Sequence, residues 1–349
     1  MNSRKAEESG RCDRLSLRAA RACASDVASV VVACSSLIEV LLSRSLWTVW
    51  CLRSSHVTAP GRGVRRVSGV RIDLHTHSTA SDGTDAPGDV VRAAARADLD
   101  VVALTDHDTT SGWDEAAAAA RETGVALVRG TEISARAEDT SVHLLSYLHD
   151  PADPTLVAMF DRVCAARDAR AREMVERLGV DFPLTWEHVL AQTAPGTTIG
   201  RPHIADALVA AGYATDRSAA FAQMLSPAAP YYVPHYAPEA VDVVVAVRAA
   251  GGVPVFAHPG ASERGRIVSD RVVHALAEAG LAGLEVAHRD NGPEQRLRLS
   301  RLAHTLGLLV TGSSDYHGSG KRNQLGEHTT ASDVFTEIER RGRITVVRA

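Results

Sequence analysis

The chain has 349 residues, 45% of them hydrophobic and 23% charged, which is enough for one large or two smaller globular domains. The whole chain has a net charge of −4 and its first 69 residues a net charge of +6, so residues 70–349 carry −10. An acidic balance of that size argues against a broad nucleic-acid-binding surface, and therefore against duplex DNA as a partner.

Residues 1–69 differ in composition from the rest of the chain. They contain four of the five cysteines and two of the four tryptophans. Their most apolar run, 27–42, is interrupted by three serines and Glu39 and is shorter than the roughly 18–20 apolar residues of a membrane span. We interpret residues 1–69 as a poorly ordered tail or as sequence upstream of a true start near Val70. A targeting segment and a membrane anchor are the alternatives.

From Val70 onward, short apolar runs alternate with Ala/Arg-rich runs of helical spacing. The predicted strands are 71–75, 101–105, 126–130, 142–148, 253–258, 283–287 and 308–312. The predicted helices between them include 89–97, 113–123, 270–279 and 295–306. This alternation predicts an α/β fold with a parallel sheet, and seven such units suggest a closed or nearly closed barrel. In barrels of that kind the site lies at the carboxyl ends of the strands.

Residues 151–236 interrupt the alternation, because no convincing strand follows 142–148 until 253–258. We predict a long helix and three shorter ones there, over 154–178, 185–193, 201–211 and 216–225. We interpret the segment as a small helical insertion domain over the mouth of the barrel, where it would select the substrate.

The most informative motif is His75-Thr76-His77, at the end of the first predicted strand. Alternate residues of a strand point to one face, so the two imidazoles project together and can hold one divalent ion. The following loop supplies Asp82 as an oxygen ligand and Gly83 for a sharp turn. Alone, such a pair fits two ordinary histidines near a turn equally well.

Histidines and carboxylates also follow most of the other strands. They are His107 after the second strand, Glu132 after the third, His143 within the fourth, His258 after the fifth, and Asp315 and His317 after the seventh. Such groups are costly to bury unpaired, so nine of them along one sheet edge are too many for packing alone. They also exceed the four ligands of a tetrahedral ion, which implies two or three ions.

Amidohydrolase barrels also open with a His-x-His motif, and a carboxylated lysine commonly bridges their two metal ions. This chain has only two lysines, Lys5 and Lys321, and neither follows a middle strand. Glu132 is the natural bridging ligand instead, which argues against the amidohydrolase interpretation.

The ordered motifs resemble those of the polymerase and histidinol phosphatase (PHP) superfamily. The matching segments are His75-x-His77, Ser81-Asp82-Gly83, Thr105–Asp108, Gly130–Glu132, Ala257–Pro259 and Ser314–His317. The resemblance covers residues 70–349 and implies a distorted seven-unit (β/α)7 barrel with a trinuclear metal site, interrupted by the insertion at 151–236. One departure is Asp98, where relatives often have glycine after the first helix; aspartate tolerates the left-handed conformation required there.

The resemblance implies three ligand sets. One ion takes His75, His77, Glu132 and Asp315, a second takes Asp82, His107 and His317, and the third takes Glu132, His143 and His258. The family is associated with manganese, iron or zinc, and a mixture of histidine and carboxylate fits each of these better than a purely magnesium site. We expect Mn²⁺, with Fe²⁺ or Zn²⁺ as alternatives.

Clustered divalent ions suit the hydrolysis of phosphate esters, because they bind the non-bridging oxygens, lower the pKa of a water to make hydroxide and stabilise the leaving oxygen. The implied enzyme is a metal-dependent phosphoesterase, with Asp315, His107 and His317 as the residues expected to take part in catalysis. Either histidine could protonate the leaving group, and the sequence does not decide between them.

The insertion adds features that bind anions. The segment Gly200-Arg201-Pro202-His203 opens a predicted helix, and a helix N-terminus favours phosphate. Arg201 and His203 would strengthen that preference. Arg170 and Arg172 lie on the long helix, where the alternative is a solvated face with glutamate partners. Extra arginines beside a phosphatase site suggest a substrate with more than one phosphate.

Within the superfamily this arrangement resembles the branch that hydrolyses nucleoside 3′,5′-bisphosphates and, as an exonuclease, trims short 5′-phosphorylated RNA. In that branch the residues matching Arg170 or Arg172, and His203, contact the substrate. A histidinol-phosphate phosphatase, or another small phosphomonoester phosphatase, is the alternative, although histidinol phosphatases generally lack the insertion. A degenerate metal-binding module without catalysis would predict missing ligands, and all nine are present.

Cysteine usage bears on the compartment. Residues 70–349 contain a single cysteine, Cys164, which leaves no disulfide framework. We therefore expect a cytoplasmic protein without a membrane partner, whose partner is a small phosphorylated substrate.

Overall fold

The computed structural model describes residues 69–349. The interpretations of residues 1–69, including the apolar run 27–42, fall on residues 1–68 and so lie outside the described residues. Within residues 69–349, no helix is both long and apolar enough to span a bilayer.

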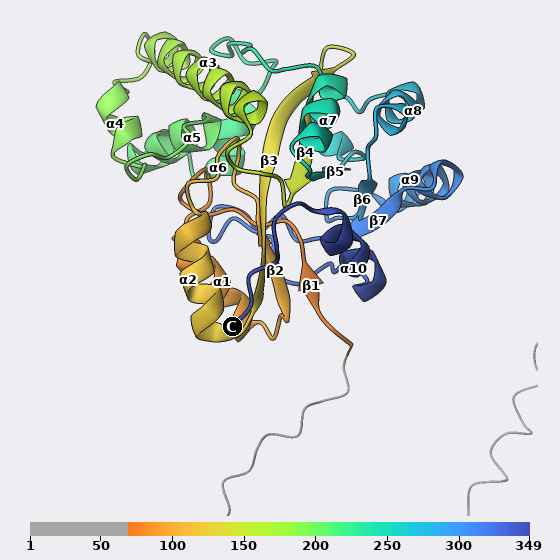
Figure 1. Ribbon diagram of the computed structural model, residues 1–349. Coiled ribbons are helices and arrows are strands. Elements are labelled where there is room, and N and C mark those ends of the chain that lie inside the picture. Colours follow the sequence, from red (N-terminus) through yellow and green to blue (C-terminus); the bar gives the residue numbers. More distant parts are fainter. Residues whose placement is uncertain (1–68) are drawn as a thin grey trace, which may run out of the picture. The chain divides into compact units, whose positions relative to one another are not determined.

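Seven strands form one sheet, in which each strand pairs with the next along the chain (Figure 1). Their bounds are β1 Ile72–Asp73, β2 Val101–Leu104, β3 Ala126–Ala137, β4 Thr140–Tyr147, β5 Val253–Phe256, β6 Gly283–Ala287 and β7 Leu309–Gly312. The segments that follow β1 and β7 meet, because the His77 N–H donates to the Tyr316 carbonyl at 2.8 Å. The sheet is therefore the distorted, nearly closed α/β barrel that the sequence predicts.

The expectation of a wholly parallel sheet is wrong at β4, which is antiparallel to both β3 and β5. β3 runs on to Ala137 and forms a hairpin with β4. The turn residues Glu138 and Asp139 both have positive φ, at 49° and 58°. Asn-Gly and Asp-Gly pairs mark such turns in a sequence, and Glu-Asp does not. No residue pattern therefore indicated that a tight turn, and not a helix, joins β3 to β4.

Within residues 69–349, six α-helices accompany the barrel strands. They are α1 Pro87–Arg96, α2 Trp113–Thr123, α7 Ala240–Ala249, α8 Asp270–Glu278, α9 Pro293–Leu306 and α10 Ser332–Arg341. After α1, Asp98 has a φ of 54°. This is the left-handed conformation expected at a position where relatives often have glycine.

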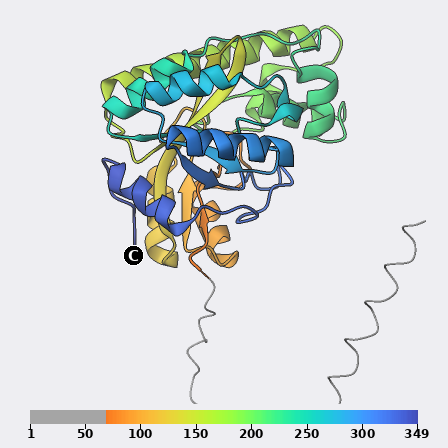
Figure 2. The same cartoon turned by 90° about the vertical axis from the view of Figure 1, so that its right-hand side faces the viewer.

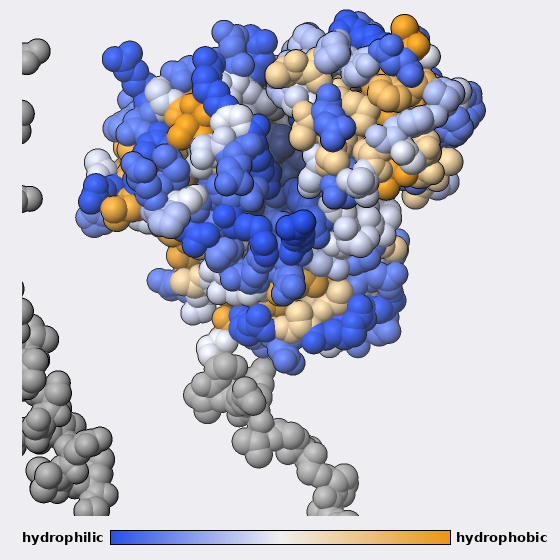
Figure 3. Space-filling view, turned by 180° about the vertical axis from the view of Figure 1, so that it is seen from behind, coloured by the Kyte–Doolittle hydropathy of each residue, from blue (hydrophilic) through white to orange (hydrophobic). Residues whose placement is uncertain are grey.

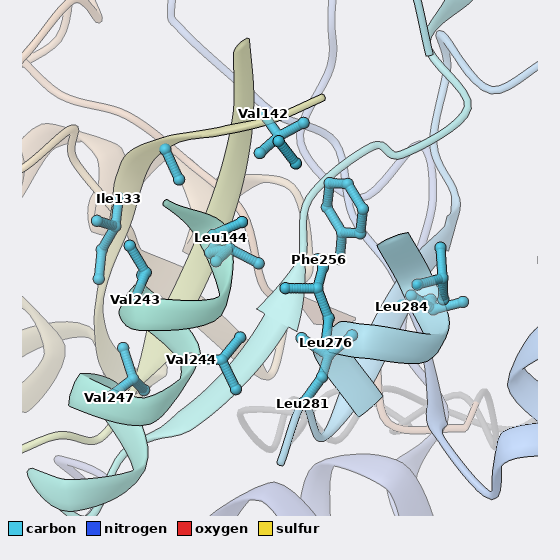
Figure 4. Packing of buried hydrophobic residues seen from close by; sticks show 14 of the residues in the cluster. Ile133, Val142, Leu144, Val243, Val244, Val247, Phe256, Leu276, Leu281 and Leu284 are labelled. Carbon is cyan, nitrogen blue, oxygen red and sulfur yellow. The ribbon is translucent and has the colours of Figure 1, made fainter. Parts of the chain in front are cut away.

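Strand alternation separates the outer packing from the interior. On β3, Ile133 lies in an outer apolar cluster with Leu144 of β4 and Val243 of α7, which Figure 4 shows in close contact. The neighbouring Glu132 points the other way, into the barrel. Deeper in the barrel, Leu74 and Tyr147 belong to a second apolar cluster, and the Tyr147 hydroxyl donates to the Leu74 carbonyl at 2.9 Å. Apolar side chains thus fill one end of the barrel and leave the other to polar residues.

The helices of residues 151–236 form a separate layer. They are α3 Pro154–Leu178, α4 Trp186–Leu190, α5 Arg201–Ala210 and α6 Arg217–Ala220, followed by a π-helical turn over Phe221–Leu225. The Asp153 side chain caps α3 by accepting from the N–H groups of Thr155 and Leu156. A third apolar cluster, which includes Met174, Ile204 and Leu208, holds these helices together. Figures 1 and 2 show them gathered above α1 and α2, beside the upper end of β3.

Candidate metal centre

The first two histidines lie side by side after β1. Both are fully buried, and their Nε2 atoms are 3.1 Å apart. Glu132 Oε2 lies 3.2 Å from His75 Nε2 and 3.0 Å from His77 Nε2. Asp315 Oδ1 lies 3.5 Å from each of the two. These four residues offer ligand atoms that all lie within 4.8 Å of one another, and they are the set assigned above to the first ion.

A second group forms around Asp82. Its Oδ1 lies 3.2 Å from His317 Nε2, and its Oδ2 lies 3.8 Å from His107 Nε2. His77, Asp82 and His107 also have ligand atoms within 4.8 Å of one another. The three residues assigned to the second ion therefore come together, and His77 stands between this group and the first.

The third group uses the other oxygen of Glu132. Oε1 lies 2.8 Å from His143 Nδ1 and 2.9 Å from His258 Nε2. His107 Nδ1 lies 3.4 Å from Glu132 Oε2, which joins the second and third groups. Glu132 touches histidines of every group, so it has the position of a bridging ligand.

The hairpin explains how His143 reaches this position. His143 pairs with Ser134 across the two strands, and Ser134 is two residues from Glu132, so all three side chains share the inner face. Two other predicted ligands have strained backbones, with φ of 32° at His258 and 55° at Asp315. Strain of this kind persists where the surrounding structure fixes a functional side chain.

Several buried ligand atoms have no hydrogen-bond partner among the described residues. They are His107 Nδ1, His317 Nε2 and Asp315 Oδ1. A buried polar atom without a partner is costly unless something else satisfies it. Divalent cations held by the first and second groups would accept electron pairs from these atoms, so the residues fit a metal cluster.

The charge states favour metal binding. Burial lowers the pKa of His107 well below its usual value. Burial, then Lys321 and His77, lowers the pKa of His317 to about 4. Burial, then Arg264, lowers the pKa of His258 to about 3. These imidazoles are neutral at pH 7, which is the form that binds metal.

The carboxylates of the cluster remain ionised despite their burial. Burial raises the pKa of Glu132, but His143, His107 and His75 lower it by more, so the pKa lies well below its usual value. Burial also raises the pKa values of Asp82 and Asp315, but the adjacent imidazoles of His317 and His107 lower that of Asp82 by more, and Lys321 with its neighbours does the same for Asp315. The three buried carboxylates lie beside the neutral imidazoles of His107, His258 and His317, and this excess of negative charge makes a site that needs positive charge.

Sequence reasoning missed Glu285, which orients two ligands from the middle of β6. It is fully buried, its Oε1 lies 3.0 Å from His75 Nδ1, and its Oε2 accepts from the His258 N–H at 2.7 Å. Fixing the far nitrogen of a ligand histidine sets its tautomer and ring orientation. The sequence feature that could have revealed Glu285 is its place inside an otherwise apolar predicted strand, 283–287.

Two cations missed by the sequence analysis hold Asp315. Its Oδ2 accepts from Arg264 Nη2 at 2.6 Å and from Lys321 Nζ at 2.9 Å. The Oδ1 atom is thereby left to face His75 and His77. Neither cation follows its strand directly, so no strand-end pattern pointed to it.

The four residues expected to bind substrate are not equivalent. Arg170 and His203 are buried, with 6% and 3% of their surface exposed, and Arg201 is partly buried. Arg172 is half exposed, pairs with Asp168 and lies over the Trp186 ring at 4.1 Å. Its contacts are within the insertion, and the structure gives it none with the nine ligands.

Arg170 and Arg201 lie in a positively charged cluster. Arg170 Nη1 lies 3.1 Å from His235 Nδ1, and its buried Nε has no partner among residues 69–349. Arg201 donates to the Leu225 carbonyl and lies over the rings of Phe221 and Tyr232.

The positive charges of this cluster repel one another, and the cluster lies close enough to the predicted ligand His143 to interact with it. Burial, then Arg167 and Arg201, lowers the pKa of Arg170 to about 9. Burial, then these three arginines and the ligand His143, lowers the pKa of His235 to about 3. In Figure 3 the surface is hollowed between the insertion and the barrel, and the walls of the hollow are hydrophilic.

Comparison with known proteins gives concordant results. The family model of the PHP domain matches residues 73–178. The 3′,5′-nucleoside bisphosphate phosphatase of Chromobacterium violaceum is 36% identical over 283 residues, covering 77% of this chain and 97% of that protein. A 5′-3′ exoribonuclease of Haemophilus influenzae is 32% identical over 270 residues, covering 77% of this chain and 97% of that protein. A solved structure described as a metal-dependent phosphoesterase, from Bifidobacterium adolescentis, matches with a TM-score of 0.78 and 50% identity, covering 79% of this chain and 98% of that one.

Proposed function

This chain belongs to the PHP family of metal-dependent phosphoesterases, and we propose that it hydrolyses phosphate esters of nucleotides that carry more than one phosphate. The proposed substrates are nucleoside 3′,5′-bisphosphates and the 5′-phosphorylated ends of short RNA. The two relatives described above carry the names of these two activities, and each is covered almost completely by this chain.

The observation that carries the substrate proposal is the pair of arginines without carboxylate partners. Among the described residues, Arg170 and Arg201 make no ion pair with an aspartate or glutamate. Uncompensated cations are costly to bury, and an anion restores the balance. A phosphate of the substrate, other than the one hydrolysed, would supply that anion. His203, buried at the start of α5, is proposed to assist them.

The proposed cofactor is three divalent ions, Mn²⁺ in preference to Fe²⁺ or Zn²⁺. The proposed ligands are the nine residues of the cluster, six histidines and three carboxylates, with Glu132 shared. That donor set suits manganese, iron or zinc better than magnesium alone. When bound, such ions supply Lewis acidity toward the phosphate oxygens and lower the pKa of a water so that hydroxide is available near neutral pH.

The protein's own residues hold this chemistry in place. Glu132 and Asp315 contribute negative charge between the histidine groups, and Glu285 fixes His75. The arginines of the insertion would orient the substrate so that a single ester faces the cluster, and orientation is a large part of catalysis. The neutral state of His107 and His317 at pH 7 favours them as ligands over proton donors to the leaving group.

We propose further that the protein acts in the cytoplasm on small substrates rather than on duplex DNA. The acidic balance of residues 70–349 and their single cysteine, Cys164, support this.

Phosphate release tests the proposal. The full-length protein with Mn²⁺ would be given adenosine 3′,5′-bisphosphate and, in parallel, histidinol phosphate. We expect rapid release of one phosphate from the bisphosphate, abolished in Asp315→Ala. Turnover of histidinol phosphate alone would replace the nucleotide proposal with the histidinol-phosphatase alternative. A folded protein without bound metal and without turnover of either substrate would identify a degenerate binding module.

A further inference from the structure

The insertion contacts the barrel at the loop that carries Asp82. Three carbonyls of this loop accept hydrogen bonds from the insertion. Thr197 Oγ1 donates to the carbonyl of residue 79 at 2.7 Å, Thr198 N to that of residue 80 at 3.0 Å, and Arg217 Nη1 to that of Asp82 at 3.0 Å. Backbone groups of a metal-ligand loop are thus held by residues more than a hundred positions further along the chain.

Arg217 is itself firmly placed. Its Nε and Nη2 atoms both donate to the carboxylate of Asp206 at 2.5 Å, and its side chain is only 15% exposed. A two-point contact of this kind fixes the plane of the guanidinium, which leaves Nη1 aimed at the Asp82 carbonyl. A side chain at Gly320 would overlap this guanidinium, so Arg217 also lies against the loop that follows His317.

The insertion also holds the loop that carries His107. Arg167 Nη1 donates to Asp108 Oδ2 and to Ser134 Oγ, both at 2.9 Å. Asp108 directly follows His107 and has a φ of 53°, a strained conformation that needs support from its surroundings. The insertion therefore contacts residues at or beside Asp82, His107 and His317, the three residues of the second group.

The remaining ligands are held differently. His75 and His258 are oriented by Glu285, which belongs to the barrel. Within residues 69–349, no hydrogen bond joins the insertion to residues 253–291, the part of the barrel from β5 to the loop after β6. The hydrogen bonds of the insertion are thus made beside the second group, and at Ser134 beside Glu132 and His143, but not beside His258.

We infer that the insertion is a structural part of the second metal position, with Arg217 as its main positioning residue. This rests on the proposed function, because it presumes that Asp82, His107 and His317 hold an ion. Removing the Arg217 donor frees the Asp82 carbonyl and lets the ligand carboxylate leave its place. Outer residues that orient ligands typically contribute 10- to 100-fold to metal affinity. The inference therefore predicts selective loss of one ion.

The test is Mn²⁺ binding by the full-length protein carrying Arg217→Met. Bound manganese per chain is measured by mass spectrometry after gel filtration, and affinity by titration. We expect the weakest-bound equivalent to weaken by at least about 10-fold relative to wild type, with partial rescue in Arg217→Lys, which keeps one donor. Thr197→Val, which removes the donor to residue 79, is expected to act in the same direction, and the exposed Arg172→Met is the matched control.

A thermal-melting experiment separates positioning from general stability. In EDTA, Arg217→Met is expected to melt close to wild type, whereas the increase in Tm on adding Mn²⁺ is expected to be smaller. An equal loss of Tm with and without Mn²⁺ would overturn the inference. So would unchanged Mn²⁺ content and affinity in both Arg217→Met and Thr197→Val. Either result would leave the proposed function standing. A wild-type protein that binds no Mn²⁺ would overturn the proposed function along with it.

Discussion

Glu132 and His143 face one another from the two arms of one hairpin, with Oε1 of the glutamate 2.8 Å from Nδ1 of the histidine. The antiparallel pairing of β3 and β4 makes this possible, because it sends β4 back past the ligand on β3. A parallel strand in this place would have brought only its carboxyl end to the site. The departure from a regular barrel thus brings a predicted metal ligand to the site.

The first prediction concerns the glutamate of that pair. Glu132→Gln keeps the size of the side chain but removes the charge shared by the three groups. We expect metal content to fall and kcat/KM to drop by more than about 100-fold, since even outer residues contribute 10- to 100-fold. Phosphate release and metal analysis check this. The exposed Glu176→Gln serves as the control, and wild-type activity in Glu132→Gln would contradict the bridging role.

The second prediction concerns Glu285. Glu285→Gln can satisfy His75 Nδ1 or the His258 N–H with its one oxygen, but not both. We expect Mn²⁺ affinity to fall about 10- to 100-fold while activity recovers at saturating Mn²⁺. Activity measured across a Mn²⁺ titration shows the shift, with Glu278→Gln on the exposed side of α8 as the matched control. No change in the Mn²⁺ dependence would mean that Glu285 only supports packing.

The third prediction separates the arginines of the insertion. Arg201→Met and Arg170→Met are expected to raise KM for adenosine 3′,5′-bisphosphate about 10- to 100-fold, the factor for losing about 1.5–3 kcal/mol in a hydrogen bond to a charged group. Hydrolysis of a simple monophosphate should change little, because it lacks the second phosphate. Arg172→Met should behave as wild type on both substrates. Equal losses on the two substrates would place these arginines elsewhere in the mechanism.

The fourth prediction is a pH dependence of stability from His149, which lies outside the metal centre. This histidine is fully buried between Trp113 and Phe160, and burial lowers its pKa from 6.5 to about 4. The unfolded chain therefore binds a proton on this group at a higher pH than the folded chain does. Its contribution to stability is present above pH 6.5 and is lost as the pH falls toward 4, by up to about 3 kcal/mol.

His149→Phe removes this dependence. Urea unfolding in EDTA, at pH 5 and pH 7, should show a smaller difference between the two pH values for the variant than for wild type. The exposed His274→Gln is the control and should keep the wild-type difference. The ligand histidines contribute equally to all three proteins, so an unchanged difference in His149→Phe would show that this group does not titrate as its burial requires.

The meeting of most of the nine predicted ligands could be anticipated because they follow strand ends, and strand ends of one sheet meet regardless of their distance in sequence; Glu132 and His143 lie within β3 and β4 instead. The start of α3 could also be predicted, since a proline in the first turn, Pro154, and a capping aspartate, Asp153, are typical of a helix N-terminus. The spacing of the arginines along α3 also indicates which of them share a face of the helix. Arg167 and Arg170 are three residues apart and face one side, whereas Arg172 is two residues further on and faces another.

Much of what the sequence did not reveal depends on contacts between distant segments. Arg264 is 51 residues from the Asp315 carboxylate that it contacts, and Arg217 is 135 residues from the carbonyl that it holds. No local pattern encodes such pairings. Lys321 is only six residues from Asp315, but no strand-end pattern points to it. The hairpin at Glu138 was hidden for a different reason, because a turn can adopt positive φ without glycine when the strands on either side pair strongly.

The bridge between Thr76 and Tyr316 joins a segment that is synthesised early to one that is synthesised late. His75 and His77 leave the ribosome early, whereas Asp315 and His317 leave only after the strands that separate them. Closing so long a stretch of chain is slow compared with forming the β3–β4 hairpin. We expect the native ligand set to be complete only once nearly the whole chain is free, so a fragment ending before Leu309 should retain Mn²⁺ poorly in the same mass-spectrometric assay. The ion that the enzyme carries would then be chosen from the pool it meets after release, and not during translation.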